Sequence, residues 1–333
     1  MLDSTKFCGL TQNERRIIPI LCCRKKTTMG QRTETLVMKE FPDFSQPGFD
    51  IERYNQRFHN SNVVIHAKSR AVEYPVHWSS LTIKCAFGGE EHYESNNMHY
   101  TVDDDHFLVF NNGKMYSSWI SSRSEVESFT LNINPSFEQE AVRSVVRKTN
   151  EQLDDPFSTT HYDFRFTERL YKHEDIVTRV LRKIRNGSED ESLLFYQLME
   201  DLMLLQSKTN NEIARIDKSK RSTQVEIFNR LIRARDYIHS CYSQEITIED
   251  LAGVACMNTF YFLRQFRNAF GVTPHRFLTL RRMEVAASLL RSTSLPVSEV
   301  CIDSGFSDLS SFAKLFRRHY GISPAAFRMY VKS

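Results

Sequence analysis

The chain has 333 residues, 41% of them hydrophobic and 12% aromatic, which provides apolar surface for about two folded domains and excludes an intrinsically disordered protein. The formal net charge is +3, but residues 221–333 contain 15 Lys and Arg against 9 Asp and Glu, so the preceding residues are net negative. A cationic surplus confined to one end of a chain is typical of a nucleic-acid-binding region.

The first 45 residues are predicted to be a flexible extension. Ile17–Cys23 is a short apolar run after two arginines, but Arg24–Lys26 follows it instead of the small residues of a signal-peptide cleavage site. Met29 is an alternative start, and whether residues 1–28 belong to the native protein is left open. No segment has the roughly twenty apolar residues of a membrane span, so we predict a cytoplasmic protein without membrane contact.

Residues 46–135 have the pattern of short strands in an antiparallel β-barrel or jelly roll. The strand-like runs are Val63–Ile65, Leu81–Phe87, Met98–Val102, His106–Phe110, Met115–Ile120 and Val126–Ile133. Turn residues separate them at Gly88-Gly89, Asp103–Asp105 and Asn111–Gly113. Asn-Gly between two such runs is the strongest hairpin signal in the chain, so we expect the strands on either side of Asn111–Gly113 to pair.

Residues 136–206 are predicted to be helical. We expect helices at 136–148, around 176–184 and at Glu191–Gln206, the last of which is unusually apolar at Leu202–Leu205. Two interpretations stay open, namely a homodimer interface or packing against the barrel of the same chain. The polar, charged residues 207–222 are predicted to be a linker.

Residues 223–333 are predicted to form an all-helical domain. An amphipathic helix at 224–241 precedes a helix capped by Thr247, with Asp250 in the capping-box position. A long helix is expected to begin at Thr273-Pro274 and to continue to about Leu290, because a hydroxyl cap followed by proline favours a helix start.

Residues 294–324 are predicted to be a helix-turn-helix. The first helix ends at Gly305, which can adopt a positive φ, and Asp308 is a good N-cap for the second helix. Apolar residues recur at helical spacing on the second helix, at Leu309, Phe312, Leu315, Phe316 and Tyr320. The opposite face is small and basic, a shape that suits the DNA major groove, which admits one α-helix.

A second copy of this pattern lies fifty residues earlier, where Asn258–Phe277 aligns with Asp308–Phe327. The identical pairs are Phe262 and Phe312, Phe266 and Phe316, Arg267 and Arg317, Gly271 and Gly321, Pro274 and Pro324, and Phe277 and Phe327. Upstream of the turn the offset is forty-nine residues, so the two turns differ in length by one residue. Two copies are too few for a repeat array and indicate a duplicated helix-turn-helix.

This duplicated unit closely resembles the DNA-binding domain of the AraC/XylS family of bacterial transcription regulators. The resemblance covers about the last third of the chain and rests on Asp236–His239, Ile246–Ala252, Gly271–Phe277, Arg281–Glu284 and residues 294–324, in family order. It implies two helix-turn-helix units joined by a long helix, each inserting its second helix into one of two successive major-groove segments. It also implies a cupin-like sensor barrel at 46–135, and hence an α+β chain.

The resemblance implies a sequence-specific transcription regulator, taken here as an activator, whose N-terminal domain senses an effector or dimerises. Two alternatives stay open, a DNA-binding scaffold without an effector and a metal-dependent cupin enzyme fused to a DNA-binding domain. The enzyme would need an H-x-H pair followed by Glu. The histidines of this region are instead scattered, at His66, His77, His92, His99 and His106. We therefore predict no enzyme activity, no catalytic residue, no metal and no cofactor, and interpret Asp103–Asp105 as a polar turn in preference to a cation site.

Other reactive and aromatic residues give weaker signals. The seven cysteines are odd in number and contain no C-x-x-C pair, which predicts neither a disulfide framework nor a zinc site. Cys256 and Cys301 are interpreted as small core residues. Five aromatic residues of the barrel either line an effector pocket or belong to the core, and the effector site stays unassigned; they are Trp78, Tyr93, Tyr100, Tyr116 and Trp119.

The residues predicted to contact DNA bases lie on the free faces of the two second helices. They are Phe260, Leu263, Arg264, Ser310, Ala313 and Lys314. Arg264 and Lys314 are placed mid-face, where they can donate to guanine O6 and N7. Phe260 and Leu263 are expected to meet thymine methyl groups or, alternatively, to pack against the long helix. Ser310 and Ala313 are small enough to allow close approach.

Phosphate contacts are predicted for Thr247, Arg267, Arg281, Arg282 and Arg317. The expected partner is double-stranded operator DNA. RNA polymerase, a small-molecule effector and a second copy of the chain are further candidates. The effector, the operator sequence, activation versus repression and the oligomeric state are left open.

Overall fold

The computed structural model describes residues 34–42, 60–146, 164–173, 175–187, 190–217 and 220–332. Most of the predicted flexible extension, including residues 1–28, lies outside this part of the chain. Residues 34–42 are described, and they contain a strand, β1 (Thr35–Met38), that pairs in parallel with the strand beginning at Asn62. The predicted extension therefore ends earlier than residue 45, because Leu36 and Val37 pair with the edge of the sheet.

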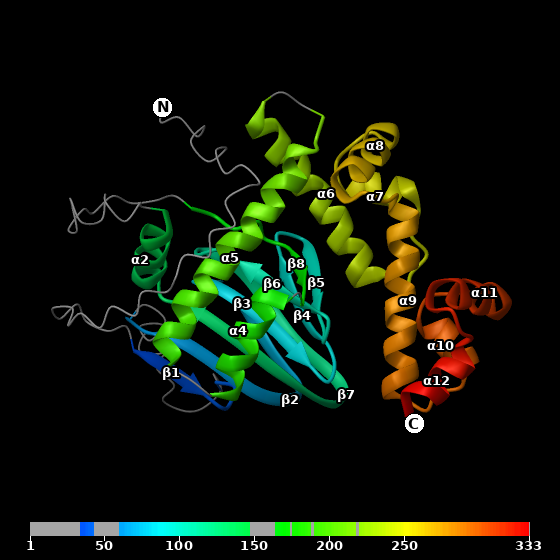
Figure 1. The fold of residues 1–333 in the computed structure, drawn as a ribbon, viewed down its shortest axis with the longest axis horizontal. Coiled ribbons are helices and arrows are strands. Elements are labelled where there is room, and N and C mark those ends of the chain that lie inside the picture. The colour runs from blue at the N-terminus through cyan, green and yellow to red at the C-terminus, as the bar shows by residue number, and fades with distance from the viewer. Residues whose placement is uncertain are drawn as a thin grey trace. The chain divides into compact units, whose positions relative to one another are not determined.

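The described residues of the N-terminal region form one sheet (Figure 1). Its strands are β1, β2 (Asn62–Ser79), β3 (Leu81–Phe87), β4 (Glu91–Ser95), β5 (Met98–Val102), β6 (His106–Phe110), β7 (Lys114–Ile133) and β8 (Leu170–Lys172). The order is β1-β2-β7-β3-β6-β8, and β4 pairs with both β5 and β7. Among the described strands this path is open, with β1 and β8 at its ends, so the predicted closed barrel is not formed.

The two longest strands, β2 and β7, determine the curvature of the sheet. Their pairing is interrupted by register shifts between Ser69 and Ala71 and between Tyr74 and His77. Such bulges bend a strand and increase its twist. On its other edge β7 pairs with β3 near Ile133 and with β4 near Trp119. Strand β7 is thus shared by two segments of the sheet, one that contains β3 and one that contains β4. The curved sheet has an inner and an outer face.

The hairpin predicted at Asn111–Gly113 is wrong. The residues do form a turn, with Gly113 at φ 82°, but β6 and β7 are separated in the sheet by β3. The tight hairpin lies instead between β4 and β5, where Asn96 and Asn97 have φ values of 51° and 59°. Asparagine tolerates this left-handed conformation, which two-residue hairpin turns require.

Helices cover the outer face of the sheet (Figure 1). They are α2 (Pro135–Val146), α4 (Asp175–Asn186) and α5 (Glu191–Ala214). In the apolar run of α5, Leu202 and Met203 are buried in the core that this face shares, whereas Leu204 is 55% exposed. Packing against the same chain therefore accounts for the apolar side of α5. Leu204 by itself exposes too little apolar surface to indicate a dimer interface.

The predicted linker is mostly helical. Helix α5 continues to Ala214, and α6 begins at Arg221 and ends at Cys241. Ile213 and Ile216 are buried in the first core of the C-terminal helices, which stabilises the end of α5 and the turn after it. Only a short connection is left between α5 and α6.

The C-terminal region is all-helical, as predicted. After α6 it contains α7 (Ile248–Val254), α8 (Thr259–Phe270), α9 (Pro274–Ser292), α10 (Val297–Asp303), α11 (Leu309–Tyr320) and α12 (Pro324–Lys332). The long helix α9 contributes Leu278 to a core shared with α6, α7 and α8, and Met283 and Leu290 to a second core shared with α10 and α11 (Figure 1). Each helix-turn-helix is therefore stabilised by its own core. None of the described helices combines the length and apolar content needed to cross a bilayer.

Candidate nucleic-acid interface and ligand cavity

Local signals position the first helix-turn-helix, α7–α8. Thr247 and Asp250 form the predicted capping box at the start of α7. Asn258 caps α8 through its side chain, and Gly271 ends α8 in the left-handed conformation with φ 75°. Phe262 and Phe266 are fully buried, so the opposite side of α8 is directed to solvent.

The second unit, α10–α11, repeats this construction. Asp308 accepts hydrogen bonds from the backbone N–H groups of Ser310 and Ser311, and Gly321 ends the helix with φ 81°. In the turn, Gly305 has φ 86°, and Cys256, forty-nine residues earlier, has φ 51°. Each of the two turns thus contains one residue in the left-handed conformation, which is a glycine in the second turn and a cysteine in the first. Cys256 is exposed and not the core residue that we predicted, whereas Cys301 is buried as predicted.

The six predicted base-contact residues form one solvent-facing strip on each second helix. On α8, Phe260 is 87% exposed, Arg264 is exposed and Leu263 is half-buried. On α11, Ser310 and Lys314 are exposed and Ala313 is half-buried. The two strips occupy equivalent positions fifty residues apart. Because Phe260 is so exposed, packing against α9 does not explain it.

The predicted phosphate contacts divide into two groups, and the first lies beside the two strips. Arg267 and Arg317 are exposed in the last turns of α8 and α11. Thr247 is exposed too, but its hydroxyl and backbone N–H are both engaged with Asp250.

The second group, Arg281 and Arg282, faces inward. Arg281 is only 4% exposed, and its guanidinium Nη2 lies 2.6 Å from Asp103 Oδ2. Arg282 donates from Nε to the Tyr242 carbonyl and from Nη2 to the Gln244 carbonyl, both at 2.8 Å. These positions contradict the prediction of phosphate contact. Two adjacent arginines in a sequence are typical of a solvent-exposed basic surface. In the structure they lie on a part of α9 that packs against α6.

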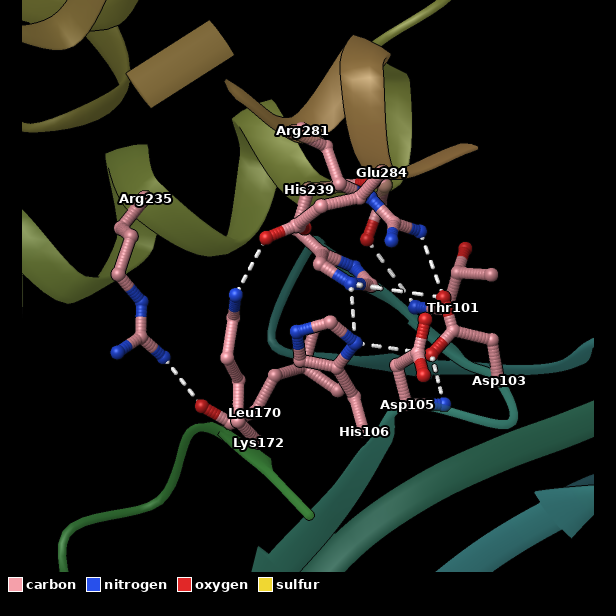
Figure 2. Close-up of polar contacts among 11 residues, drawn as sticks. Thr101, Asp103, Asp105, His106, Leu170, Lys172, Arg235, His239, Arg281 and Glu284 are labelled. Atoms are coloured by element: carbon pink, nitrogen blue, oxygen red, sulfur yellow. Dashed lines mark hydrogen bonds and ion pairs between the residues drawn. The ribbon is translucent and has the colours of Figure 1, made fainter. Parts of the chain in front are cut away.

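Sequence reasoning missed a group of polar contacts between the sheet and the C-terminal helices. Figure 2 shows Asp103 of the β5–β6 connection and His106 at the start of β6 facing His239 of α6 and Arg281 of α9. Burial by itself would raise the pKa of Asp103, but hydrogen bonding from His106 and the charge of Arg281 hold it well below its usual range. Residues 133 positions apart, such as His106 and His239, carry no local signal of their contact.

A cavity of about 90 Å³ lies on the inner face of the sheet. Lys84, Trp78 and Tyr116 are among its lining residues. Lys84 is buried, and its Nζ lies 4.8 Å from the centroid of the Tyr116 ring. Its positive charge interacts with the carboxylate of Glu91, which also lines the cavity. Burial lowers the pKa of Lys84 to about 8, so the ammonium still carries its charge near neutral pH.

Other polar atoms of the cavity also lack partners. Glu91 Oε2, Ser80 Oγ and Asn132 Nδ2 line or border it and are buried without a hydrogen-bond partner. Buried polar groups are normally paired, so unpaired ones that share a cavity with a buried ammonium indicate a ligand site. Of the five aromatic residues left open by the sequence, Trp78 and Tyr116 line the cavity, whereas Tyr93 and Tyr100 belong to the inner core.

Comparison with known proteins agrees with the C-terminal geometry. Residues 251–330 match the family of helix-turn-helix domains, with the same two units found in α7–α8 and α10–α11. This segment is an AraC-type helix-turn-helix domain. It includes all six residues that are predicted to contact bases.

Similar proteins match part of this chain. The probable transcriptional regulator LumQ of Photobacterium leiognathi is 31% identical over 147 residues, covering 42% of this chain and 59% of LumQ. The lactose operon transcription activator of Staphylococcus xylosus is 28% identical over 154 residues, covering 46% and 52%. A solved structure of a probable AraC family regulator from Rhodopseudomonas palustris is 26% identical, with a TM-score of 0.30, and covers 31% of this chain and 97% of that one. The chain spans about half the length of the curated relatives it matches.

Proposed function

We propose that the protein is a sequence-specific transcription regulator that reads DNA with α8 and α11. The observation that carries this proposal is the pair of matching solvent-facing strips, each on a helix that its own buried core and end caps hold in place. Two helices of this kind, joined by α9, suit two successive segments of the major groove. A name among the relatives, that of the lactose operon activator, favours activation, and RNA polymerase is then a partner.

Individual residues of the strips have different roles. Arg264 and Lys314 donate hydrogen bonds to base edges, and the planar guanidinium of Arg264 can contact both acceptors of one guanine. Phe260 contacts a thymine methyl group, which explains an aromatic side chain that is 87% exposed. Arg267 and Arg317 lie further along the helices and contact phosphates.

The sheet domain is proposed to sense a small molecule in the cavity beside Lys84. The buried ammonium of Lys84 can donate to an anionic group, and the unpaired Glu91 oxygen can accept from a hydrogen-bond donor. A compact molecule with a carboxylate and a hydroxyl or amino group meets both requirements. This cavity favours an effector-responsive regulator over a scaffold without an effector, and a cupin-like role for the sheet is part of the same proposal.

DNA reading is tested by selecting bound sequences from random DNA with the full chain and measuring affinity for the best site. Arg264→Ala should lose about 1–3 kcal/mol of binding free energy at that site and relax the preference at one base position. Arg317→Ala should weaken binding to all sequences equally and reduce the salt slope by about 1. Arg123→Ala removes an exposed arginine of the sheet domain and should change neither property. Unchanged affinity and preference in Arg264→Ala would refute the assigned role.

Effector binding is tested separately by thermal denaturation with a panel of small hydroxy acids and amino acids. A compound that stabilises the wild-type protein should have no effect on Lys84→Met, because the variant retains the volume of the side chain but lacks the ammonium group. Equal stabilisation of both proteins would place the ligand elsewhere.

A further inference from the structure

Three metal-ligating side chains meet where the sheet contacts the C-terminal helices (Figure 2). His106 Nδ1 lies 2.9 Å from Asp103 Oδ1 and 3.0 Å from His239 Nε2. His239 Nε2 lies 3.7 Å from Asp103 Oδ2. All three side chains have little exposure to solvent, at 15% for Asp103 and 6% or less for the two histidines.

The neighbouring backbone holds these side chains in position. The Thr101 N–H donates to Ser240 Oγ at 3.1 Å, which joins β5 to the residue after His239. The Asp105 N–H donates to Asp103 Oδ1 at 3.1 Å, which fixes the carboxylate within its turn. Backbone hydrogen bonds on both sides of the contact therefore help to position the three ligand side chains.

Hydrogen bonding among the three groups is incomplete whichever tautomers are chosen. His106 Nδ1 can make one hydrogen bond in the plane of its ring, through either a proton or a lone pair. It nevertheless lies within hydrogen-bond distance of both a carboxylate and another imidazole. If the proton is on His106 Nδ1, then His239 must carry its own proton on Nδ1, which is buried without a partner. If instead His239 Nε2 is protonated, the lone pair of His106 faces the Asp103 oxygen. One buried polar group is left unsatisfied in either case.

A divalent cation can satisfy all three groups at once, because their ligand atoms all lie within 4.8 Å of one another. We propose that Asp103, His106 and His239 bind a Zn²⁺ ion. In a tetrahedral zinc site with bonds of about 2.0–2.1 Å the ligand atoms lie about 3.3 Å apart. The two histidine nitrogens lie 3.0 Å apart, and they lie 2.9 Å and 3.7 Å from the two different oxygens of Asp103, so these distances lie on both sides of that value. Two imidazoles and one carboxylate are suitable zinc ligands and leave a fourth position for water or another molecule.

The surroundings of the site set its expected strength. Arg281 donates to Asp103 Oδ2 at 2.6 Å, which orients the carboxylate but also places a positive charge near the ion. We therefore expect reversible binding and not a permanent structural ion.

The position of the site connects metal binding with DNA binding. Asp103 and His106 belong to the sheet domain, whereas His239 lies in the last turn of α6, whose core includes the buried phenylalanines of α8. An ion held by all three fixes α6, and with it the first helix-turn-helix, relative to the sheet. This consequence rests on the proposed regulator function, whereas the metal site itself does not.

Zinc binding is tested on the full chain after chelator treatment and dialysis, by calorimetric titration with ZnCl₂ and by the visible spectrum after CoCl₂ addition. We expect one Zn²⁺ per chain and the ligand-field bands of tetrahedral Co²⁺. His239→Ala and His106→Ala should each weaken zinc binding more than 100-fold, since even indirect partners of metal ligands change affinity by about 10–100-fold. His66→Ala removes another histidine that contacts a carboxylate, Glu127, and should leave binding unchanged.

Several outcomes would overturn the site. They are a wild-type protein that binds no zinc, a cobalt spectrum without tetrahedral bands, and zinc binding that survives in both His106→Ala and His239→Ala. The cobalt spectrum needs no variant, so the test stands even if a histidine variant fails to fold. DNA affinity is measured in the same samples with and without Zn²⁺. Zinc binding without any DNA binding would refute the regulator function alone, and DNA binding without zinc binding would refute the metal site alone.

Discussion

Arg281 of α9 and Asp103 of the β5–β6 connection form an ion pair 178 residues apart in sequence, with Nη2 and Oδ2 separated by 2.6 Å. Arg281 is 4% exposed, so its charge is compensated chiefly by this carboxylate. The pair joins the AraC-type domain to the sheet domain. This ion pair explains why an arginine that was expected to contact a phosphate is buried against the sheet domain.

Arg281→Met should destabilise the protein by about 3–5 kcal/mol, because it leaves the Asp103 carboxylate buried without its partner. The double variant Arg281→Met/Asp103→Asn should lose less than the sum of the two single losses, since no unpaired charge then stays inside. Urea denaturation of the four proteins measures the coupling. Strictly additive losses would show that the two side chains do not depend on each other.

Phe260→Ala should reduce DNA affinity without changing the free energy of unfolding by more than about 0.5 kcal/mol, because an exposed side chain contributes little to the core. Val76→Ala is a matched control, since Val76 is an apolar residue of the sheet with 65% exposure. It should change neither quantity. A large loss of stability in Phe260→Ala would mean that the ring packs inside the domain.

Gly305→Ala should be more destabilising than Gly321→Ala, although both glycines have positive φ values, of 86° and 81°. The shared left-handed conformation costs about 1–2 kcal/mol for any residue with a Cβ. At Gly305 that Cβ would also lie 2.8 Å from the Tyr242 carbonyl oxygen, whereas at Gly321 nothing lies within 4 Å. Thermal or urea denaturation should show a further loss of about 1–3 kcal/mol from this overpacking. Equal losses of stability in the two variants would mean that the α6–α7 connection shifts away from the added Cβ without cost.

The stability of the protein should rise with pH between about 8 and the ordinary lysine value, through Lys84. Burial lowers its pKa to about 8, from 10.5, so within this window the unfolded chain holds a proton that the folded chain has lost. Below this window both states are protonated and the cost of burying the charge is fully present. The difference in unfolding free energy between wild type and Lys84→Met isolates this group from other titrations. A difference that is constant from pH 7 to pH 11 would contradict the lowered pKa.

Local features of the C-terminal domain were predictable because they depend on neighbours in sequence. The Thr247–Asp250 capping box, the Asp308 cap and the left-handed Gly305 each involve residues within one helical turn. Fold elements that need distant partners were predicted less well. Asn111–Gly113 carried a hairpin signal, but β3 occupies the place that its hairpin partner would take.

The duplicated helix-turn-helix and the two solvent-facing strips follow from residue spacing alone, because helical spacing sets which side chains share a face of one helix. The contacts between the sheet and the C-terminal helices follow from packing. His106, His239 and Asp103 meet only because β5 packs beside α6, and Arg281 is withdrawn from solvent by the same packing. Such contacts depend on how whole elements pack together, and no pattern within a single element records which partner it will meet.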